Sequence, residues 1–383
     1  MFLLGKNTAH SVALALVFAS ANLAQTTLNC QGGRCIKTVT GTFPVGARLR
    51  VNANGPVALD AGSSKDLTYT ATAQFWARSE ADARRMLEQY AIRMFPQGEW
   101  SVLATPMGPL TATLQIHSPK LSAASIYTMD GSVEARGVDG TLDVESGGGP
   151  VTVDRIAGDC RVRTGGGGVR AGALGGALHL STGVGSITVA SVSGEAVLQT
   201  MGGDIVVGNA GGAVYAETGV GMVRVEHAAG QVTATSGGGQ IWVGDARGMV
   251  ITRSAAGPVR VGSAAGVNCD TASGYVELGS VYGAMRVATA MGDILASLMG
   301  GRMADSFLSS GNGDITVMIP SNVGVTIQAE NAMADSARRI VSEFPQIPVR
   351  VVGMRVVAEG AVNGGGPVLH VSASSGTIFI KRK

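Results

Sequence analysis

Apolar residues recur at every ninth position along the central part of this chain. The series runs unbroken from Val133 to Val259, and one residue is then lost before it resumes at Val267. Within each nine-residue unit apolar and polar residues alternate, which is typical of a short β-strand. The units end in glycine, where the chain can turn. A unit this short cannot bury its own apolar face, so successive units must stack on one another.

Two kinds of unit alternate, so the full repeat is eighteen residues long. One kind carries Ser or Thr after its strand, as in Thr141–Gly149, and the other carries a further apolar residue, as in Ser186–Gly194. About ten repeats lie between residues 123 and 301. Parallel stacking at ~4.8 Å per coil predicts an all-β fold, a parallel β-solenoid roughly 50 Å long. The first inner column is expected to hold Val133, Val151, Val169, Ile187, Ile205 and Val223.

Composition excludes several classes of protein. The 29 basic and 27 acidic side chains give a net charge of +2, which provides no electrostatic basis for binding nucleic acid or an acidic membrane. Glycine makes up 57 of the 383 residues, but without a Gly-X-Y period, which excludes collagen. A hydrophobic content of 45% is too high for a disordered chain.

The N-terminal residues have the pattern of a secretory signal peptide. Lys6 and His10 precede the apolar run Ser11–Ala24, and the small residues Ala19–Ala21 mark a cleavage site, so residues 1–21 are expected to be removed. No later stretch reaches the ~20 apolar residues of a transmembrane segment. We therefore expect an exported protein that resides in the periplasm, on the cell surface or outside the cell.

The segments that flank the repeats are expected to cap the solenoid. Residues 22–122 combine alternating strands with a helix, and residues 320–383 are rich in strands, on either side of solenoid residues 123–319. The helix is expected to start at Ser79, because Asp82 follows three residues later as in an approximate capping box. Such caps cover the open coils at the two ends of a solenoid.

Export makes the four cysteines informative. Cys30 and Cys35 bracket a short flexible loop and are expected to form a local disulfide. Cys160 and Cys269 lie six coils apart in the predicted stack. Six coils separate them by ~30 Å, whereas a disulfide needs Cα atoms within ~7 Å. We expect these two residues to be buried free thiols.

Ser and Thr residues form the most regular polar column of the repeats. We expect their hydroxyls to bond to the backbone of the glycine turns, rather than to form an outward array that matches a glycan or ice. Asp204, Asp293 and Asp314 also follow glycines, but they are too few for stacked calcium sites, which need about six to eight oxygens per ion. No metal and no cofactor are therefore expected. The column comprises Thr128, Ser146, Thr164, Thr182, Thr200, Thr218, Ser236, Ser254, Thr271 and Thr289.

One polar cluster has features of a glycoside hydrolase. Asp143 and Glu145 share a face at a distance of roughly 7 Å, which suits two carboxylates of an inverting enzyme. The arginines expected beside them, Arg161 and Arg163, would hold both carboxylates ionised and leave no general acid. Ion pairs between neighbouring coils, continued by His179, explain the same residues without catalysis.

Some outward strand positions carry large apolar residues. Val206, Tyr215, Trp242 and Ile251 are candidates for a surface contact patch, although a cap or a partner could also cover them.

The chain resembles a known group of bacterial proteins. The motifs that carry the resemblance are a recurring Gly-Asp-Ile and the segments that open and close the repeat region: 203–205, 292–294, 313–315, Leu114–Pro119, Gly364–Val371 and Ser375–Ile380. They are similar to the bacterial β-strand-repeat families classed as candidate adhesins, akin to the heads of auto-transporter adhesins. The resemblance implies an adhesin-like β-solenoid and supplies no catalytic residues.

Together these observations favour an exported, non-enzymatic protein that binds or scaffolds through a repetitive β-solenoid surface. A glycan or a protein of the cell surface or envelope is the expected partner. Two alternatives stay open at this point: a β-helix enzyme that acts on polysaccharide, and a periplasmic structural protein without a ligand.

Overall fold

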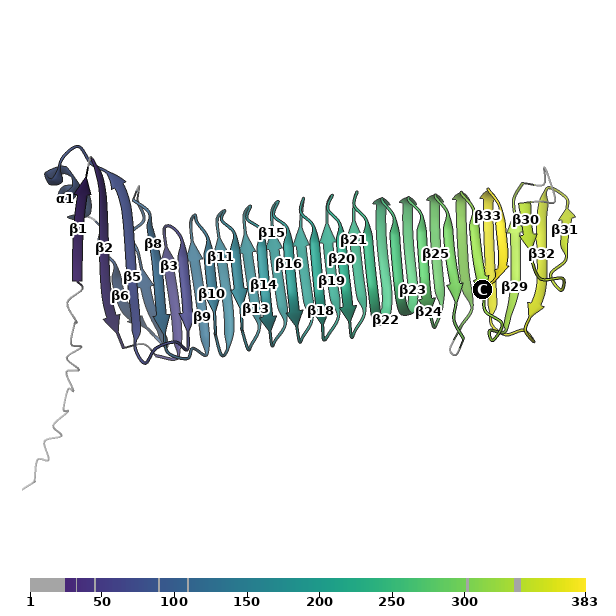
Figure 1. The fold of residues 1–383 in the computed structure, drawn as a ribbon, viewed down its shortest axis with the longest axis horizontal. Helices are drawn as coiled ribbons and strands as arrows, with labels where there is room; N and C mark the ends of the chain where they lie inside the picture. The colour runs from purple at the N-terminus through teal and green to yellow at the C-terminus, as the bar shows by residue number, and fades with distance from the viewer. Residues whose placement is uncertain are drawn as a thin grey trace, which may run out of the picture.

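The computed structural model describes residues 25–383 apart from 32, 45, 89, 109, 301–302 and 334–338. The expected signal peptide, residues 1–21, lies outside the described residues. The chain forms a long, narrow parallel β-solenoid of about 11 turns with one short helix near the N-terminal end (Figure 1). The fold class predicted from the nine-residue spacing is confirmed.

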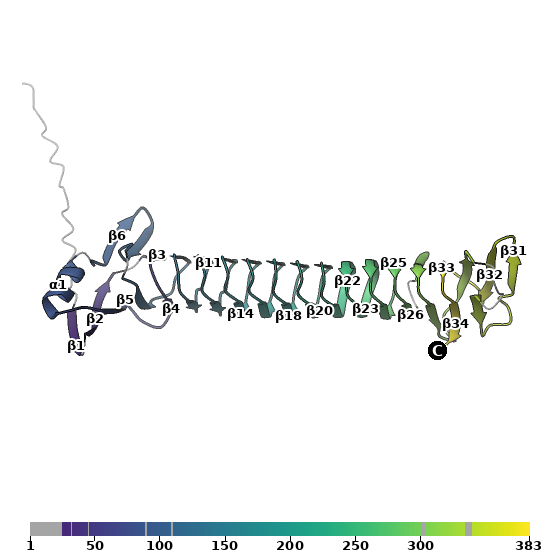
Figure 2. The same ribbon diagram turned by 90° about the horizontal axis from the view of Figure 1, so that it is seen from above.

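Each coil contributes one strand to each of two faces, which Figure 2 shows as two rows of strands. Face A consists of β10 (Val133–Arg136), β12 (Val151–Asp154), β14 (Val169–Leu174), β16 (Ile187–Val192), β18 (Ile205–Ala210), β20 (Val223–Ala228), β24 (Val276–Val281), β26 (Ile294–Leu298) and β28 (Ile315–Ile319). Face B consists of β11 (Thr141–Ser146), β13 (Cys160–Thr164), β15 (Leu178–Thr182), β17 (Ala196–Thr200), β19 (Val214–Thr218), β21 (Val232–Ser236), β25 (Met285–Met291) and β27 (Ser306–Asn312). The long strands β22 (Ile241–Ala256) and β23 (Val259–Ser273) pass from face A to face B.

The inner columns follow the alternation of the sequence. Parallel pairing sets Val133 opposite Val151 and continues the column through every eighteenth residue to Val223. All members of this column are buried, while the residues between them along each strand point outward. Burying one such side chain stabilises the fold by about 1.5–3 kcal/mol relative to leaving it exposed. Each stacked coil therefore adds its own share of core.

The Ser and Thr column is buried, and most of its hydroxyls bond to the turn backbone as the sequence predicts, but those of Ser254 and Thr271 have no partner among the described residues. The Gly221 N–H donates to Thr218 Oγ1 at 3.1 Å, and the Thr218 hydroxyl donates to the Gly203 carbonyl of the preceding coil at 2.8 Å. One hydroxyl thus satisfies a backbone group in each of two stacked turns. The same two bonds recur at Thr164, Thr182, Thr200 and Ser236.

Two neighbouring serines of this column provide a matched stability test. Ser236 makes both turn bonds, each at 2.9 Å, whereas the buried hydroxyl of Ser254 on the next coil has no hydrogen-bond partner. We expect Ser236→Ala to lower the free energy of unfolding by about 1–3 kcal/mol, because it leaves two backbone groups unpaired. Ser254→Ala should change it little. Urea unfolding of both variants checks this, and equal losses would contradict the bridging role.

The one-residue loss in the repeat is absorbed by a shift of register within the paired strands β22 and β23. Ala246 lies opposite Ala264, but Met249 lies opposite Gly266, so two residues of one coil span a single residue of the next. Pairing then resumes in register along the rest of both strands. The core columns continue past the irregularity because it is confined to the corner where both strands pass from face A to face B.

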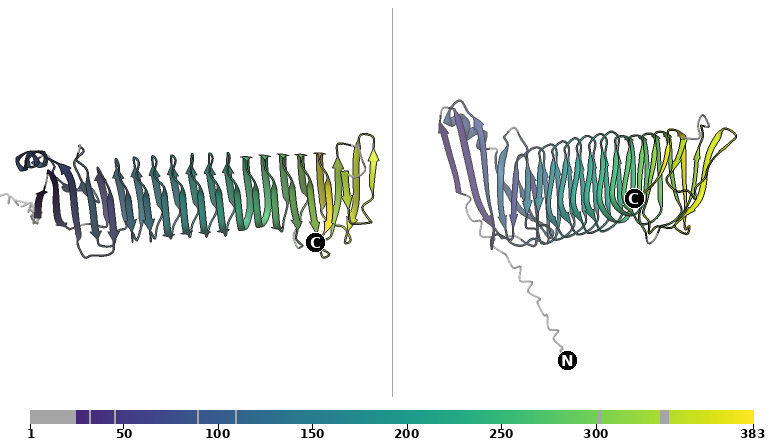
Figure 3. Two further views of the ribbon diagram at one scale, coloured as in Figure 1. Left: turned by 45° about the horizontal axis from the view of Figure 1, so that its top comes forward. Right: turned by 45° about the vertical axis from the view of Figure 1, so that its right-hand side comes forward.

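The parallel stack also includes strands that precede residue 123. On face B, β3 (Arg48–Ala53) pairs with β9 (Ala123–Thr128), β7 (Trp100–Ala104) pairs with β3, and β6 (Arg93–Gln97) ends the face. On face A, β4 (Val57–Ala61) pairs in parallel with β10 and with β8 (Ala112–Ser118). Three antiparallel strands then extend this face outward from β8, in the order β5 (Leu67–Trp76), β2 (Arg34–Phe43) and β1 (Gln25–Gln31). Figure 3 shows these strands as a flared end of the solenoid.

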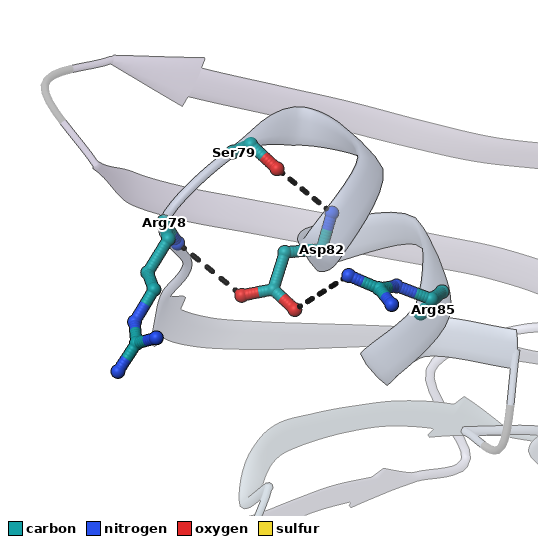
Figure 4. A network of polar contacts seen from close by, with 4 residues as sticks. All are labelled: Arg78, Ser79, Asp82 and Arg85. Carbon is teal, nitrogen blue, oxygen red and sulfur yellow. Dashed lines mark hydrogen bonds and ion pairs between the residues drawn. The ribbon is translucent and has the colours of Figure 1, made fainter.

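The single helix, α1 (Glu80–Glu88), begins where the sequence predicts. The Asp82 N–H donates to Ser79 Oγ at 3.2 Å, and the Asp82 carboxylate accepts the N–H of Arg78 at 3.4 Å (Figure 4). The guanidinium of Arg85 lies 3.5 Å from the other oxygen of the same carboxylate. The two side chains therefore satisfy backbone donors that the first turn of a helix leaves free.

The last two strands of the chain lie inside the stack rather than at its end. β33 (Val368–Ser375) pairs in parallel with β27, and β34 (Ile378–Arg382) pairs with β28. Beyond β33, face B continues with β29 (Val325–Asn331), β32 (Arg355–Val362) and β31 (Val349–Val352). Beyond β34, face A continues with β30 (Ile340–Ser342). Figure 1 accordingly shows the C-terminus short of the end of the solenoid.

Candidate functional site

Shallow hollows follow one another along face B. One of about 370 Å³ lies at the N-terminal end of the face, over β3, β7, β9, β11, β13 and β15. A second of about 410 Å³ lies over β17, β19 and β21, and a third of about 670 Å³ extends from β21 to β25. These hollows run along the solenoid axis over successive coils. Their arrangement suits an extended ligand better than a compact one.

The hollow at the N-terminal end, called the N-terminal hollow below, combines an aromatic ring with charged groups. Trp100 lines it, and the guanidinium of Arg50 lies 4.9 Å from the centre of the Trp100 ring. Asp143, Arg161 and His179 come from three successive coils and lie side by side, because β11, β13 and β15 pair in register. All three are exposed, and none of them makes a hydrogen bond or ion pair to another residue that the structure describes.

The ion pairs expected on this part of face B do not form. Asp143 lies opposite Arg161 and Glu145 lies opposite Arg163 on neighbouring strands. In the described coils, the guanidinium nitrogens and carboxylate oxygens of each pair are more than 4.0 Å apart, so neither pair forms an ion pair. In-register pairing brings opposite charges to adjacent strands, but it does not bring the charged ends of these exposed side chains into contact. Their carboxylate acceptors and guanidinium donors are therefore free to bind a ligand.

Charged side chains in the middle of face A, by contrast, have partners on the protein. Arg224 Nε lies 2.6 Å from Glu226 Oε1, and Arg260 Nε lies 3.0 Å from Glu277 Oε2. The Arg224 guanidinium also lies 4.5 Å from the centre of the Trp242 ring. Exposed ion pairs contribute only ~0.2–1 kcal/mol each to stability. Their consequence here is that these charged groups of face A are already paired on the protein.

The four apolar residues expected to form one contact patch are divided between the two faces. Val206 and Trp242 lie on β18 and β22 of face A, and Tyr215 and Ile251 lie on face B. They therefore do not form a single patch. The period-two alternation distinguishes inside from outside, but strands that follow one another in sequence belong to opposite faces. Of the four, Tyr215, which is 39% exposed, lines a hollow.

The structure places Cys30 and Cys35 in a disulfide across the β1–β2 hairpin. The two residues are register partners, with Cα atoms 4.1 Å apart. Cys35 is buried in a small cluster with Phe75 and Leu87 between the sheet and α1. The bond thus fastens the outermost strand of the N-terminal end to a packed neighbour.

Cys160 and Cys269 are free and buried at inner positions of β13 and β23. Burial raises the pKa of Cys160 to about 12 and that of Cys269 to about 11. Both therefore stay protonated near neutral pH. Because the thiolate is the nucleophilic form, neither residue is a candidate for catalysis.

The turn aspartates bond to the backbone of the next coil. Asp204 Oδ1 accepts the N–H of Met222 at 2.8 Å, and Asp293 Oδ1 accepts the N–H of Asp314, also at 2.8 Å. Within the described residues, no three His, Cys, Asp or Glu side chains are grouped so that they could hold a metal ion. Over the same residues, no helix is long and apolar enough to cross a membrane.

The repeat pattern does not reveal two residues of the N-terminal hollow. Trp100 and Arg50 lie on β7 and β3, before the first repeat, and no short motif marks them. They reach the hollow only because β3 and β7 extend face B beyond β9. Asp159, in the turn before β13, also lines the hollow, and its carboxylate accepts the Ala177 N–H at 2.8 Å.

Comparison with known proteins finds similarity to solved structures alone. No protein-family model matches the chain, and no curated protein matches it. The similar structures include a candidate cell adhesion protein of Clostridium sporogenes (12% identity, TM-score 0.21), a candidate adhesin of Bacteroides fragilis (11%, 0.19) and one of Parabacteroides merdae (11%, 0.26). They cover 91%, 90% and 74% of this chain, which covers 100%, 97% and 95% of theirs. These proteins bear the same kind of name as the families that the sequence resembles. TM-scores this low say nothing about a ligand.

Proposed function

We propose that this protein is an exported, non-enzymatic, adhesin-like binding protein that holds an extended glycan along face B. The observation that carries the proposal is the succession of hollows along this one face, with polar and aromatic side chains in them. A ligand with a repeating structure can make similar contacts on successive coils. A glycan chain is such a ligand, and its hydroxyl groups and C–H faces match what face B offers.

The hollow over β17, β19 and β21, called the central hollow below, offers side chains suited to such contacts. The ring of Tyr215 is 39% exposed and lies in register with Thr233 on the next coil. Gln199 and Glu217 line the same hollow with amide and carboxylate groups. Binding sites commonly combine an apolar or aromatic surface with a few polar groups that fix orientation. The side chains of both signs on face B and the net charge of +2 do not favour a nucleic acid.

A polysaccharide-cleaving enzyme is supported less well by the same face. Its best carboxylate pair, Asp143 and Glu145, is exposed to solvent. A general acid commonly lies in a buried setting, whereas the outward positions of these two carboxylates are open to water. Binding without cleavage is therefore the function that the site supports best.

Replacing Tyr215 with alanine should weaken glycan binding at least about fivefold, as loss of a central aromatic contact does at other binding surfaces. The measurement is a glycan-array screen followed by titration of the best ligand. Tyr275→Ala is the matched control, because Tyr275 is similarly exposed (37%) and its ring lies 5.1 Å from Arg260 of face A. Equal effects of the two substitutions would show that face B is not the binding face.

A further inference from the structure

We propose that the N-terminal hollow of face B binds one acidic sugar unit of a glycan, with its carboxylate on Arg161 and with the ring of another sugar of the same chain against Trp100. The inference rests on the proposed function and adds the chemical class of one sugar in the ligand. It draws on three features of the hollow: a free guanidinium, an aromatic wall, and a carboxylate that limits how much negative charge can enter.

Arg161 supplies the anion-binding group. Its side chain is exposed at the hollow, between Asp143 and His179 in the outward column, and it has no partner among the described residues. A guanidinium presents parallel N–H donors that match the two oxygens of a carboxylate. Arg163 stands two residues further along the same strand and is also unpaired. The hollow therefore has a strong carboxylate-binding group that the fold itself does not use.

Trp100 supplies the surface for the sugar ring. Arg50 and Arg48 lie 4.9 Å and 6.0 Å from the centre of its ring, and Arg48 is its register partner on β3. These contacts hold the half-buried indole at the N-terminal end of face B, and its remaining surface lines the N-terminal hollow. An indole presents a large, rigid apolar surface, which suits the C–H face of a pyranose ring.

Asp143 restricts the hollow to a single acidic unit. It lies opposite Arg161 and can accept hydrogen bonds from sugar hydroxyls. A second carboxylate placed beside it would be repelled. The central hollow, further along face B, is lined by Glu195 and Glu217 and by no Lys or Arg. We therefore expect a mainly neutral glycan with an acidic unit at the N-terminal end of face B.

The test compares acidic oligosaccharides with the same molecules whose charge has been masked. Neutral hexamers that carry a single glucuronate or a single galacturonate unit, and the methyl ester of each, are titrated calorimetrically into the intact protein at moderate salt. We expect one of the acids to bind about tenfold or more tightly than its ester, as a charge-assisted hydrogen-bond pair would provide. Arg161→Gln should reduce this ratio to about one and leave binding of the ester unchanged.

Three further variants make the result specific. Arg161→Lys should retain only part of the acid preference, because an ammonium lacks the paired donors of a guanidinium. Trp100→Ala should weaken the acid and the ester alike, since the ring contact does not depend on the carboxylate. Arg224→Gln is the control, because Arg224 lies on face A and is paired with Glu226. It should leave every affinity unchanged.

The outcomes separate this inference from the proposed function. An ester that binds as tightly as its acid would overturn the acidic site and leave glycan binding intact. An acid preference that survives Arg161→Gln would overturn the role of Arg161. No binding of any oligosaccharide, acid or ester, would overturn both proposals.

Discussion

Replacing Gly165 with alanine should destabilise the solenoid strongly, whereas the same change at the adjacent Gly166 should not. A Cβ at Gly165 would lie 2.1 Å from the carbonyl oxygen of Gly147 in the preceding coil, far inside contact distance. At Gly166 a Cβ would meet no atom within 4 Å. Neither glycine has a positive φ, so the two positions differ in available space and not in backbone conformation.

The expected magnitudes follow from this difference in space. At Gly165 the added methyl group forces the two coils apart and loosens the bond that the Gly165 N–H donates to the Ser146 carbonyl at 3.0 Å. Overpacking of this kind costs about 1–3 kcal/mol or more. Gly166→Ala should stabilise by ~0.4–1 kcal/mol, because alanine reduces the entropy of the unfolded chain. Thermal unfolding followed by circular dichroism measures both, and equal midpoints would contradict this account of the stacking.

Removing one complete coil, residues 187–204, should leave a folded but shorter solenoid. The deletion joins Ser186 to Ile205, which occupies the place of Ile187 one coil further on. Every remaining coil keeps a neighbour of the same kind, and the stability of a stacked-repeat protein depends mainly on such neighbour contacts. Small-angle scattering should show a particle shorter by ~4.8 Å, with a modestly lower unfolding midpoint.

Removing only residues 187–195 should destabilise the solenoid more than removing residues 187–204, although it deletes half as many residues. Ser186 would then precede Ala196, so a strand that belongs to face B would follow another face B strand. At that junction the hydroxyl of Thr200 would no longer stack on Thr182, and its bond to the Gly185 carbonyl would be lost. We expect a much lower midpoint or two separate unfolding transitions. A midpoint equal to that of the eighteen-residue deletion would show that the alternation of units is not required.

The repeat pattern was sufficient to predict the inside of the solenoid. Each inner residue contacts its counterpart one coil away, so the period alone identifies its neighbours and the stacking register. The bridging role of the Ser and Thr column follows in the same way, since the glycine turns recur with it. The helix start at Ser79 was predictable for a different reason, because a capping box is formed by residues close in sequence.

The outside of the solenoid was decided by the tertiary structure. Whether Tyr215 and Trp242 share a surface depends on how each coil turns, and the coil places them on opposite faces. Trp100 and Arg161 line the same hollow because strands from before the repeats extend face B. Whether Asp143 and Arg161 pair depends on side-chain directions that register does not determine. The sequence by itself thus determined the core and its register, because those contacts repeat with the period. The binding face was determined by non-local contacts that no period encodes.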